Sequence, residues 1–390
     1  MLDSLAADLL DHHPLAGPTG VLLRVADRVG TLAESCCGYR QTHRSHDGET
    51  RELPDPPRLT PDALFDLASV TKIAATTGAL LSLTDRRVLD PDDPARRWLP
   101  GMPAGTRLSD LLRHRAGLAE WWPVYCALAA PAQDAGAAET PVGAGGRESA
   151  GADAESAIVG LPPRYPRDAG RHYSDLGFML LGRVVERAAA QPLAAAVAAL
   201  VHEPAGMITA HYRPAGTGPD HPIVATAHGD WYERRMLATD EPYPVGVSPD
   251  SFAGWRTHTL VGEVHDGNAW HAYGGVAGHA GLFGTADDLV AFGRALLASL
   301  AGDGPWRAET VRRFVAAGPD AGQGLGFWRW PGHGALGHAG FTGIRFAVLP
   351  AVDRVAVMLT NRVHTVRREL VDLGPAWDRM LSSVAKGELG

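Results

Sequence analysis

The sequence has few cysteines, no block of basic residues and no long apolar run. Its 390 residues include three cysteines, of which Cys36 and Cys37 are adjacent, so we expect small buried side chains and no disulfide framework. The net charge is −8 without a basic cluster, which argues against nucleic acid and anionic membranes as partners. No apolar run approaches the roughly 20 residues that a membrane span requires.

The N-terminus lacks the features of an export signal. Residues 1–13 contain Asp3 and Asp8, whereas a secretory signal has a basic start and an unbroken apolar stretch. The segment instead predicts an amphipathic helix, and we expect a cytoplasmic protein. Nothing in the sequence indicates the oligomeric state.

Strand-like segments lie near both ends of the chain, and most helical segments lie between them. A chain of this length can bury a large core. The expected strands are 20–29, 31–41, 324–330, 333–340, 344–349 and 355–360. The expected helices are 69–85, 109–114, 176–190, 192–202, 285–300 and 366–384. This order predicts an α/β (α+β) fold, with an antiparallel sheet built from both termini and flanked by helices.

The middle of the chain is expected to be a helical insertion within a single domain, 1–390. The α/β part would comprise about 1–85 and 285–390, and the helical and loop sub-domain about 86–284. Within it, residues 127–157 are mostly alanine and glycine with scattered acids. Such a composition has little to pack, so we expect a mobile surface insertion, with a lid as the alternative.

Ser69-Val70-Thr71-Lys72 opens an apolar segment with helical spacing. Lys72 stands three residues after Ser69 and therefore over the same face of the helix. A serine hydroxyl beside a buried amine, at the positive end of a helix, suits nucleophilic catalysis. Because S-x-x-K also occurs by chance in many helices, the motif needs support from elsewhere in the chain.

A tyrosine loop is the second candidate part of the site. Arg171-His172-Tyr173-Ser174-Asp175 precedes a strongly apolar helix, so Tyr173 lies where its phenol can point into a cleft. Beside the Lys72 ammonium the pKa of Tyr173 is expected to fall, which would let the phenolate act as a base. The alternative is a turn tyrosine, with Ser174 or Asp175 capping the helix.

A glycine-rich segment is the third part. In Gly337-His338-Ala339-Gly340-Phe341, small residues suit a sheet edge that a substrate can approach closely. The N–H of Phe341 could then point at a developing oxyanion, with the N–H of Ser69 as the second donor. An ordinary glycine-rich hairpin is the alternative.

In this order and separation, the three segments resemble the signature of the serine β-lactamase and penicillin-binding-protein superfamily. The similarity is closest to the class C branch, which uses S-x-x-K, Y-x-N and K-T-G or H-x-G, and it extends from about residue 20 to 381. Further similar stretches are 64–69, 110–118 and 278–285. No G-x-S-x-G motif occurs, so an α/β-hydrolase esterase has no support.

The resemblance implies a role for each motif residue. Ser69 would be the acylated nucleophile and Lys72 its proton partner. Tyr173 would be the general base for acylation and the general acid toward the leaving group. Asp175 and the segment His338, Ala339 and Gly340 would contact the substrate. The mechanism implies no metal and no cofactor.

Two departures from the family pattern bear on the substrate. Asp175 stands where the family often has Asn, and an ionised carboxylate can only accept hydrogen bonds, so it should hold Lys72 as an ammonium. Ala339 lacks the hydroxyl, and His338 is only partly charged near neutrality, where the family's Thr and Lys receive a substrate carboxylate. The loss of such a charged hydrogen bond costs about 1.5–3 kcal/mol, which disfavours efficient penicillin hydrolysis.

Two further stretches, 262–269 and 360–364, resemble a sub-group of these hydrolases linked to cell-wall fragments, which includes an amidase that cuts between N-acetylmuramic acid and the peptide. They make His265, Asp266 and His279 candidate pocket residues, with a structural role as the alternative. These three residues lack the i, i+4 spacing of a zinc helix, so we expect no metal there.

The leading hypothesis is a serine hydrolase that forms an acyl-enzyme on Ser69 and cleaves an ester or amide bond of a small molecule or cell-wall fragment. The alternatives are a β-lactamase or D-alanyl-D-alanine carboxypeptidase, an N-acetylmuramyl-peptide amidase of cell-wall recycling, and an inactive binding protein on the same fold.

Overall fold

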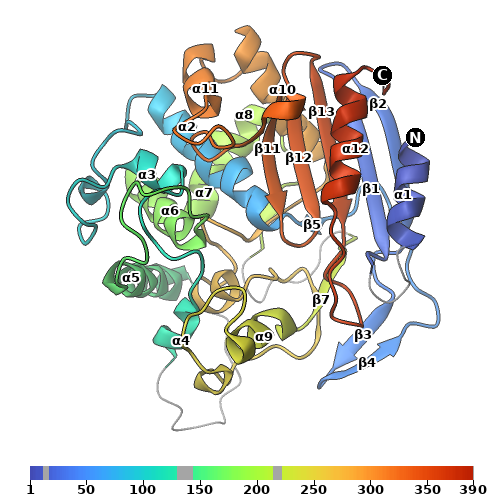
Figure 1. Ribbon diagram of the computed structural model, residues 1–390, viewed down its shortest axis with the longest axis horizontal. Coiled ribbons are helices and arrows are strands. Elements are labelled where there is room, and N and C mark those ends of the chain that lie inside the picture. Colours follow the sequence, from blue (N-terminus) through green and yellow to red (C-terminus); the bar gives the residue numbers. More distant parts are fainter. Residues whose placement is uncertain (12–16, 130–143, 214–221, 390) are drawn as a thin grey trace.

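The computed structural model describes residues 1–11, 17–129, 144–213 and 222–389. Its main sheet has six antiparallel strands in the order β10-β11-β12-β13-β1-β2, and β1 pairs with β13, so strands from the two ends of the chain lie side by side (Figure 1). The strands are β1 (Gly20–Ala26), β2 (Thr31–Gly38), β10 (Trp328–Trp330), β11 (Ala335–Gly340), β12 (Ile344–Leu349) and β13 (Arg354–Thr360). The predicted sheet from both termini is confirmed.

The sheet separates two hydrophobic cores, because successive side chains of a strand point to opposite faces. On one face, Val21 and Leu23 of β1 pack with α1 (Leu2–Asp11) and α12 (Gly374–Ala385). On the other, Leu22 of β1 belongs to the larger core, which includes α10 (Ala286–Ala301) and the helical segment 72–85 that follows Ser69. Figure 1 shows α1 and α12 along one side of the sheet and most other helices on the opposite side.

Local sequence signals explain where two of these helices begin. At α10 the Thr285 hydroxyl accepts from the N–H of Asp288 at 3.2 Å, and the Asp288 carboxylate accepts from the N–H of Thr285 at 2.9 Å, which forms a capping box. The last helix starts at Gly374, not at 366 as predicted. Pro375 lies in its first turn, where a residue without an N–H is tolerated, and Arg368 before it has a left-handed φ of 58°.

The remaining elements form the helical part and small sheets beside the main one. The helices are α2 (Gly78–Asp85), α3 (Leu108–Leu112), α4 (Val124–Leu128), α5 (Ala144–Gly160), α6 (Asp175–Ala189), α7 (Leu193–Val197), α8 (Glu203–Ala205), α9 (Trp231–Thr239) and α11 (Ala308–Val315). The strands are β3 (His43–His46), β4 (Glu49–Glu52), β5 (Phe65–Asp66), β6 (His211–Tyr212), β7 (Ala225–His228), β8 (Thr259–Val261) and β9 (Leu282–Gly284). Among the described residues, no single helix is both long and apolar enough to cross a bilayer, although the pair 175–189 and 193–205, bent by 75°, passes the same criterion together.

Part of the alanine- and glycine-rich stretch 127–157 is packed against the protein, although its composition predicted little packing. Residues 130–143 lie outside the described residues, but the later part belongs to α5. In α5 the side chain of Ala154 is fully buried, and the Glu155 carboxylate accepts from Arg187 at 2.7 and 2.9 Å. The Glu155 carboxylate also lies 3.5 Å from Arg183. Two arginines of α6 therefore anchor α5, which composition alone did not indicate.

We expect Glu155→Ala to destabilise the protein, because it removes the carboxylate shared by two arginines while Arg183 remains mostly buried. Partial exposure of Arg187 limits the effect to about 1–2 kcal/mol, which for a chain of 390 residues is a fall in melting temperature of about 1–2.5 °C. Calorimetry of this variant measures the effect, with Asp153→Ala at an exposed position of the same helix as control. Equal melting temperatures for the two variants would contradict the anchoring of α5.

Candidate active site

Ser69 lies in a sharp turn between β5 and the buried helix behind it. The segment predicted as one helix, 69–85, consists of a 3₁₀ turn over 68–70, a π-helical turn over 72–77 and then α2. Despite this irregularity, Lys72 Nζ donates to Ser69 Oγ at 2.7 Å. The expected placement of the lysine over the serine is confirmed.

The Lys72 ammonium is completely buried and makes three polar contacts. Its Nζ lies 2.7 Å from Asp175 Oδ1 and 2.7 Å from Ser69 Oγ, and it donates to the carbonyl of His279 at 3.3 Å. Burial lowers the pKa of Lys72, but the Asp175 carboxylate and then Tyr173 outweigh this effect, so the pKa lies above its ordinary value. The ion pair predicted for Asp175 is present, and Lys72 is charged at neutral pH.

Helix α6 places Asp175 for this contact. Asp175 is its first residue, and the preceding Ser174 caps the helix, because its hydroxyl oxygen accepts from the N–H of Gly177 at 3.3 Å. The same hydroxyl donates to the carbonyl of Ala119 at 2.6 Å. Capping by Ser174 therefore coexists with a position for Tyr173 and Asp175 beside Lys72.

Tyr173 lies next to both Ser69 and Lys72, whose hydrogen bonds favour its anion. Lys72 Nζ is 5.0 Å from the centre of the tyrosine ring, and the ring of His114 is 4.6 Å away. Burial nevertheless raises the pKa of Tyr173; Lys72 lowers it, Asp175 raises it, and the result is above the ordinary value. The predicted fall of this pKa is wrong, because the sequence does not show how strongly the site is desolvated or how close Asp175 lies.

A cavity of about 170 Å³ brings most of the predicted residues together. Ser69, Tyr173 and Asp175 line it, as do Phe341, His265 and Asp266. Both proposed oxyanion donors, Ser69 and Phe341, thus border the same space. Gly340 lies beside the turn over 68–70 that contains Ser69, called the serine turn below, since a Cβ at Gly340 would approach the carbonyl oxygen of Leu67 to 2.8 Å.

Four residues that were predicted to contact substrate or line the pocket, His338, Ala339, Gly340 and His279, are not among the lining residues. The His338 side chain is buried in β11, its ring 5.9 Å from that of Tyr173 and 4.5 Å from that of Trp328. Burial, and then the Lys72 charge, hold the pKa of His338 well below its usual range. His338 is therefore neutral at pH 7, which differs from the partial charge expected from the sequence.

His279 lies behind the lining residues and connects one of them to Lys72. Its Nε2 lies 2.8 Å from Asp266 Oδ1, and its carbonyl oxygen accepts from Lys72. Burial raises the pKa of Asp266, but His279 and the N–H of Ala269 outweigh this and lower it to about 2. His279 thus links an ionised carboxylate of the cavity to the backbone that holds Lys72.

Several lining residues had no sequence signal. Trp121, Tyr232, Glu233 and Tyr243 come from α9 and from loops that contain no motif. Burial, and then the Asp266 charge, raise the pKa of Glu233 well above its usual range. Only the fold, which sets these segments against the serine turn, shows that they belong to the site.

The sequence profile described as Beta-lactamase matches residues 20–376. The chain belongs to the beta-lactamase family. It is 30% identical over 349 residues to a putative D-alanyl-D-alanine carboxypeptidase of Escherichia coli K12, a match that covers 83% of this chain and 74% of the relative. A similarly named protein of Salmonella schwarzengrund is 30% identical over 379 residues, covering 90% of this chain and 80% of that one.

Solved structures share the beta-lactamase-family fold of this chain. A D-amino acid amidase from Ochrobactrum anthropi SV3, in complex with L-phenylalanine, superposes with a TM-score of 0.67 at 18% identity and full coverage of both chains. EstCE1, a hydrolase with promiscuous acyltransferase activity, superposes with a TM-score of 0.65 at 19% identity, covering 98% of this chain and 97% of its own. At these identities the likeness shows the fold alone.

We expect acylation to accelerate with pH, because a tyrosine whose pKa exceeds its ordinary value of about 10 is anionic in fewer than about one molecule in a thousand at pH 7. If the Tyr173 phenolate is the base, kcat/KM for a p-nitrophenyl ester rises about tenfold per pH unit between pH 7 and 9. Stopped-flow rates, corrected with Ser69→Ala for spontaneous hydrolysis, measure this slope. A flat profile, or an unchanged slope in Tyr173→Phe, would contradict the assignment.

Proposed function

We propose that the protein is a serine hydrolase whose Ser69 attacks an ester or amide carbonyl and forms an acyl-enzyme. The observation that carries the proposal is the contact of 2.7 Å between Lys72 Nζ and Ser69 Oγ at the wall of a cavity that Tyr173 and Phe341 also line. A nucleophile, a proton acceptor and an oxyanion donor thus border one space large enough for a small acyl group.

In the proposed acylation, the Ser69 oxygen bonds to the carbonyl carbon while its proton moves to the Tyr173 oxygen. The N–H groups of Ser69 and Phe341 stabilise the oxyanion, and Lys72 stays an ammonium that favours negative charge on both oxygens. Tyr173 then returns the proton to the leaving alcohol or amine as its bond to carbon breaks. In deacylation, water replaces Ser69 as the nucleophile and Tyr173 accepts its proton.

The charges of the cavity support an ester or amide substrate without a carboxylate near the scissile bond. The described lining residues include the carboxyl groups of Asp175, Glu233 and Asp266 and no lysine or arginine. Burial and then Arg256 lower the pKa of the lining His265 to about 4, so its ring adds no positive charge at pH 7. An anionic group therefore meets no cationic side chain among these lining residues, and the nearby Lys72 ammonium is already paired with Asp175.

A D-alanyl-D-alanine carboxypeptidase is the second candidate, since relatives at 30% identity bear that name. Its substrate ends in a carboxylate, which the neutral His338 and the hydroxyl-free Ala339 would not receive as the third motif of the resembled family does. The acidic lining therefore favours the ester or uncharged amide over this candidate.

We expect the purified protein to hydrolyse p-nitrophenyl acetate and to turn over nitrocefin at least tenfold more slowly, because the β-lactam carboxylate has no charged partner at the site, worth about 1.5–3 kcal/mol. Comparison of kcat/KM for the two substrates measures this preference. Ser69→Ala should lose both activities while keeping the melting temperature. Faster cleavage of nitrocefin than of the ester would support a β-lactamase instead.

A further inference from the structure

We infer that Asp66 is a positioning residue that fixes both sides of the oxyanion hole, an inference that rests on the proposed function. Asp66 ends β5, three residues before Ser69, and does not line the cavity that contains the nucleophile. It acts through three hydrogen bonds, each of which ends on a segment that carries or touches a proposed oxyanion donor.

The first bond fixes the serine turn. Asp66 Oδ1 accepts from the N–H of Ala68 at 2.9 Å. Ala68 has a φ of +45°, a left-handed conformation that a residue with a Cβ rarely adopts without support from its surroundings. Because Ala68 directly precedes Ser69, this bond determines the direction of the Ser69 N–H.

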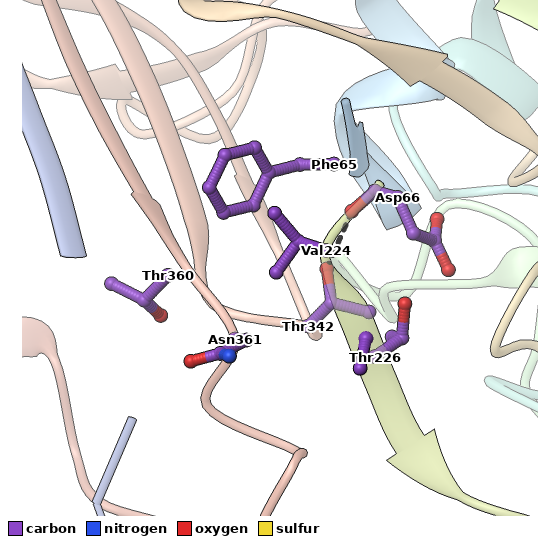
Figure 2. A pocket seen from close by; sticks show the side chains of 8 residues that line it. Phe65, Asp66, Val224, Thr226, Thr342, Thr360 and Asn361 are labelled. Atoms are coloured by element: carbon purple, nitrogen blue, oxygen red, sulfur yellow. Dashed lines mark hydrogen bonds between the residues drawn. The ribbon is translucent and has the colours of Figure 1, made fainter. Parts of the chain in front are cut away.

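The second bond fixes the strand end that carries Phe341. The carbonyl oxygen of Asp66 accepts from the Thr342 hydroxyl at 2.8 Å, and Figure 2 shows this hydroxyl directed at the main chain of Asp66. Thr342 directly follows Phe341. The bond therefore ties the peptide of the second oxyanion donor to the residue that holds the first.

The third bond fixes the Phe341 ring. Asp66 Oδ2 accepts from the N–H of His265 at 2.7 Å. The His265 ring stacks on the Phe341 ring with 5.4 Å between centroids and an interplanar angle of 28°. Phe341 is thus held through its following residue and through its side chain, and both supports lead to Asp66.

The Asp66 carboxylate is buried without an ion-pair partner in the described part of the chain. Only 2% of its surface is exposed, and its charge is stabilised by the N–H groups of Ala68 and His265. Burial raises the pKa of Asp66, the two N–H groups lower it, Asp266 raises it and Arg256 lowers it, and the resulting pKa is about 6. Protonation near pH 6 would remove an acceptor that one of the two N–H groups needs.

The test compares Asp66→Asn with wild type on p-nitrophenyl acetate. The amide has one acceptor oxygen and presents its NH₂ to the other N–H group, so it can hold only one of the two segments. We expect kcat to fall about 10- to 100-fold and KM to change less than about threefold, since misplaced oxyanion donors affect the transition state most. Asp62→Asn, at an exposed position in the turn before β5, should match wild type.

The pH profile of kcat/KM distinguishes a positioning role of the Asp66 charge from a purely structural role of this residue. In wild type, loss of the Asp66 charge should steepen the fall of log kcat/KM from one toward two per pH unit just below about pH 6, until the 10- to 100-fold loss is complete. In Asp66→Asn the slope should remain near one. Equal slopes in the two proteins, or an unchanged kcat in the variant, would overturn the inference.

Thr342→Val provides a second test if Asp66→Asn does not fold, because it removes only the hydroxyl that donates to the Asp66 carbonyl oxygen. We expect kcat to fall about 3- to 10-fold, and an unchanged kcat would overturn the inference. Labelling with a fluorophosphonate distinguishes the positioning role of Asp66 from the nucleophilic role of Ser69. If wild type and variant label on Ser69 at equal rates, Asp66 has no positioning role; if wild type does not label, the proposed function itself fails.

Discussion

The buried ammonium of Lys72 is the constraint around which the helical part of the protein is arranged. A charged amine without solvent is costly unless it is paired and hydrogen-bonded. Three segments far apart in sequence supply its partners: the serine turn through Ser69, the first turn of α6 through Asp175, and the segment before β9 through the carbonyl of His279. The need to satisfy one charge therefore brings the nucleophile, the tyrosine loop and the cavity wall together.

A second carboxylate, Asp66, connects this charged centre to the main sheet. The serine turn belongs to the segment between β5 and α2, whereas Phe341 follows β11 at the end of a sheet strand. Asp66 bonds to residues adjacent to both. The site thus lies where the helical part meets the sheet. Asp175, which is partly exposed to the cavity, pairs with the Lys72 ammonium, whereas the buried Asp66 is the residue inferred to position the two oxyanion donors.

Local patterns predicted much of this arrangement. The spacing of Ser69 and Lys72 predicted their contact, and the carboxylate of Asp175 predicted the ion pair with Lys72. Alternating strands at both termini predicted the main sheet. The predictions that were wrong or missing concern residues whose properties depend on their tertiary surroundings, which no local pattern contains. The direction of the Tyr173 pKa follows from desolvation and from Asp175 together, and His338 is neutral because it is buried in β11. Glu233 and Tyr243 reach the cavity only through tertiary packing.

If the proposed mechanism is right, Ser69 carries the acyl group during turnover. Rapid acid quench during turnover of p-nitrophenyl acetate, followed by peptide mass spectrometry, detects this group. We expect one acetyl group on the peptide that contains Ser69, accumulating before steady state if deacylation is the slower step and absent in Ser69→Ala. Full turnover with Ser69 unmodified, or an acetyl group on another residue of the cavity, would contradict it.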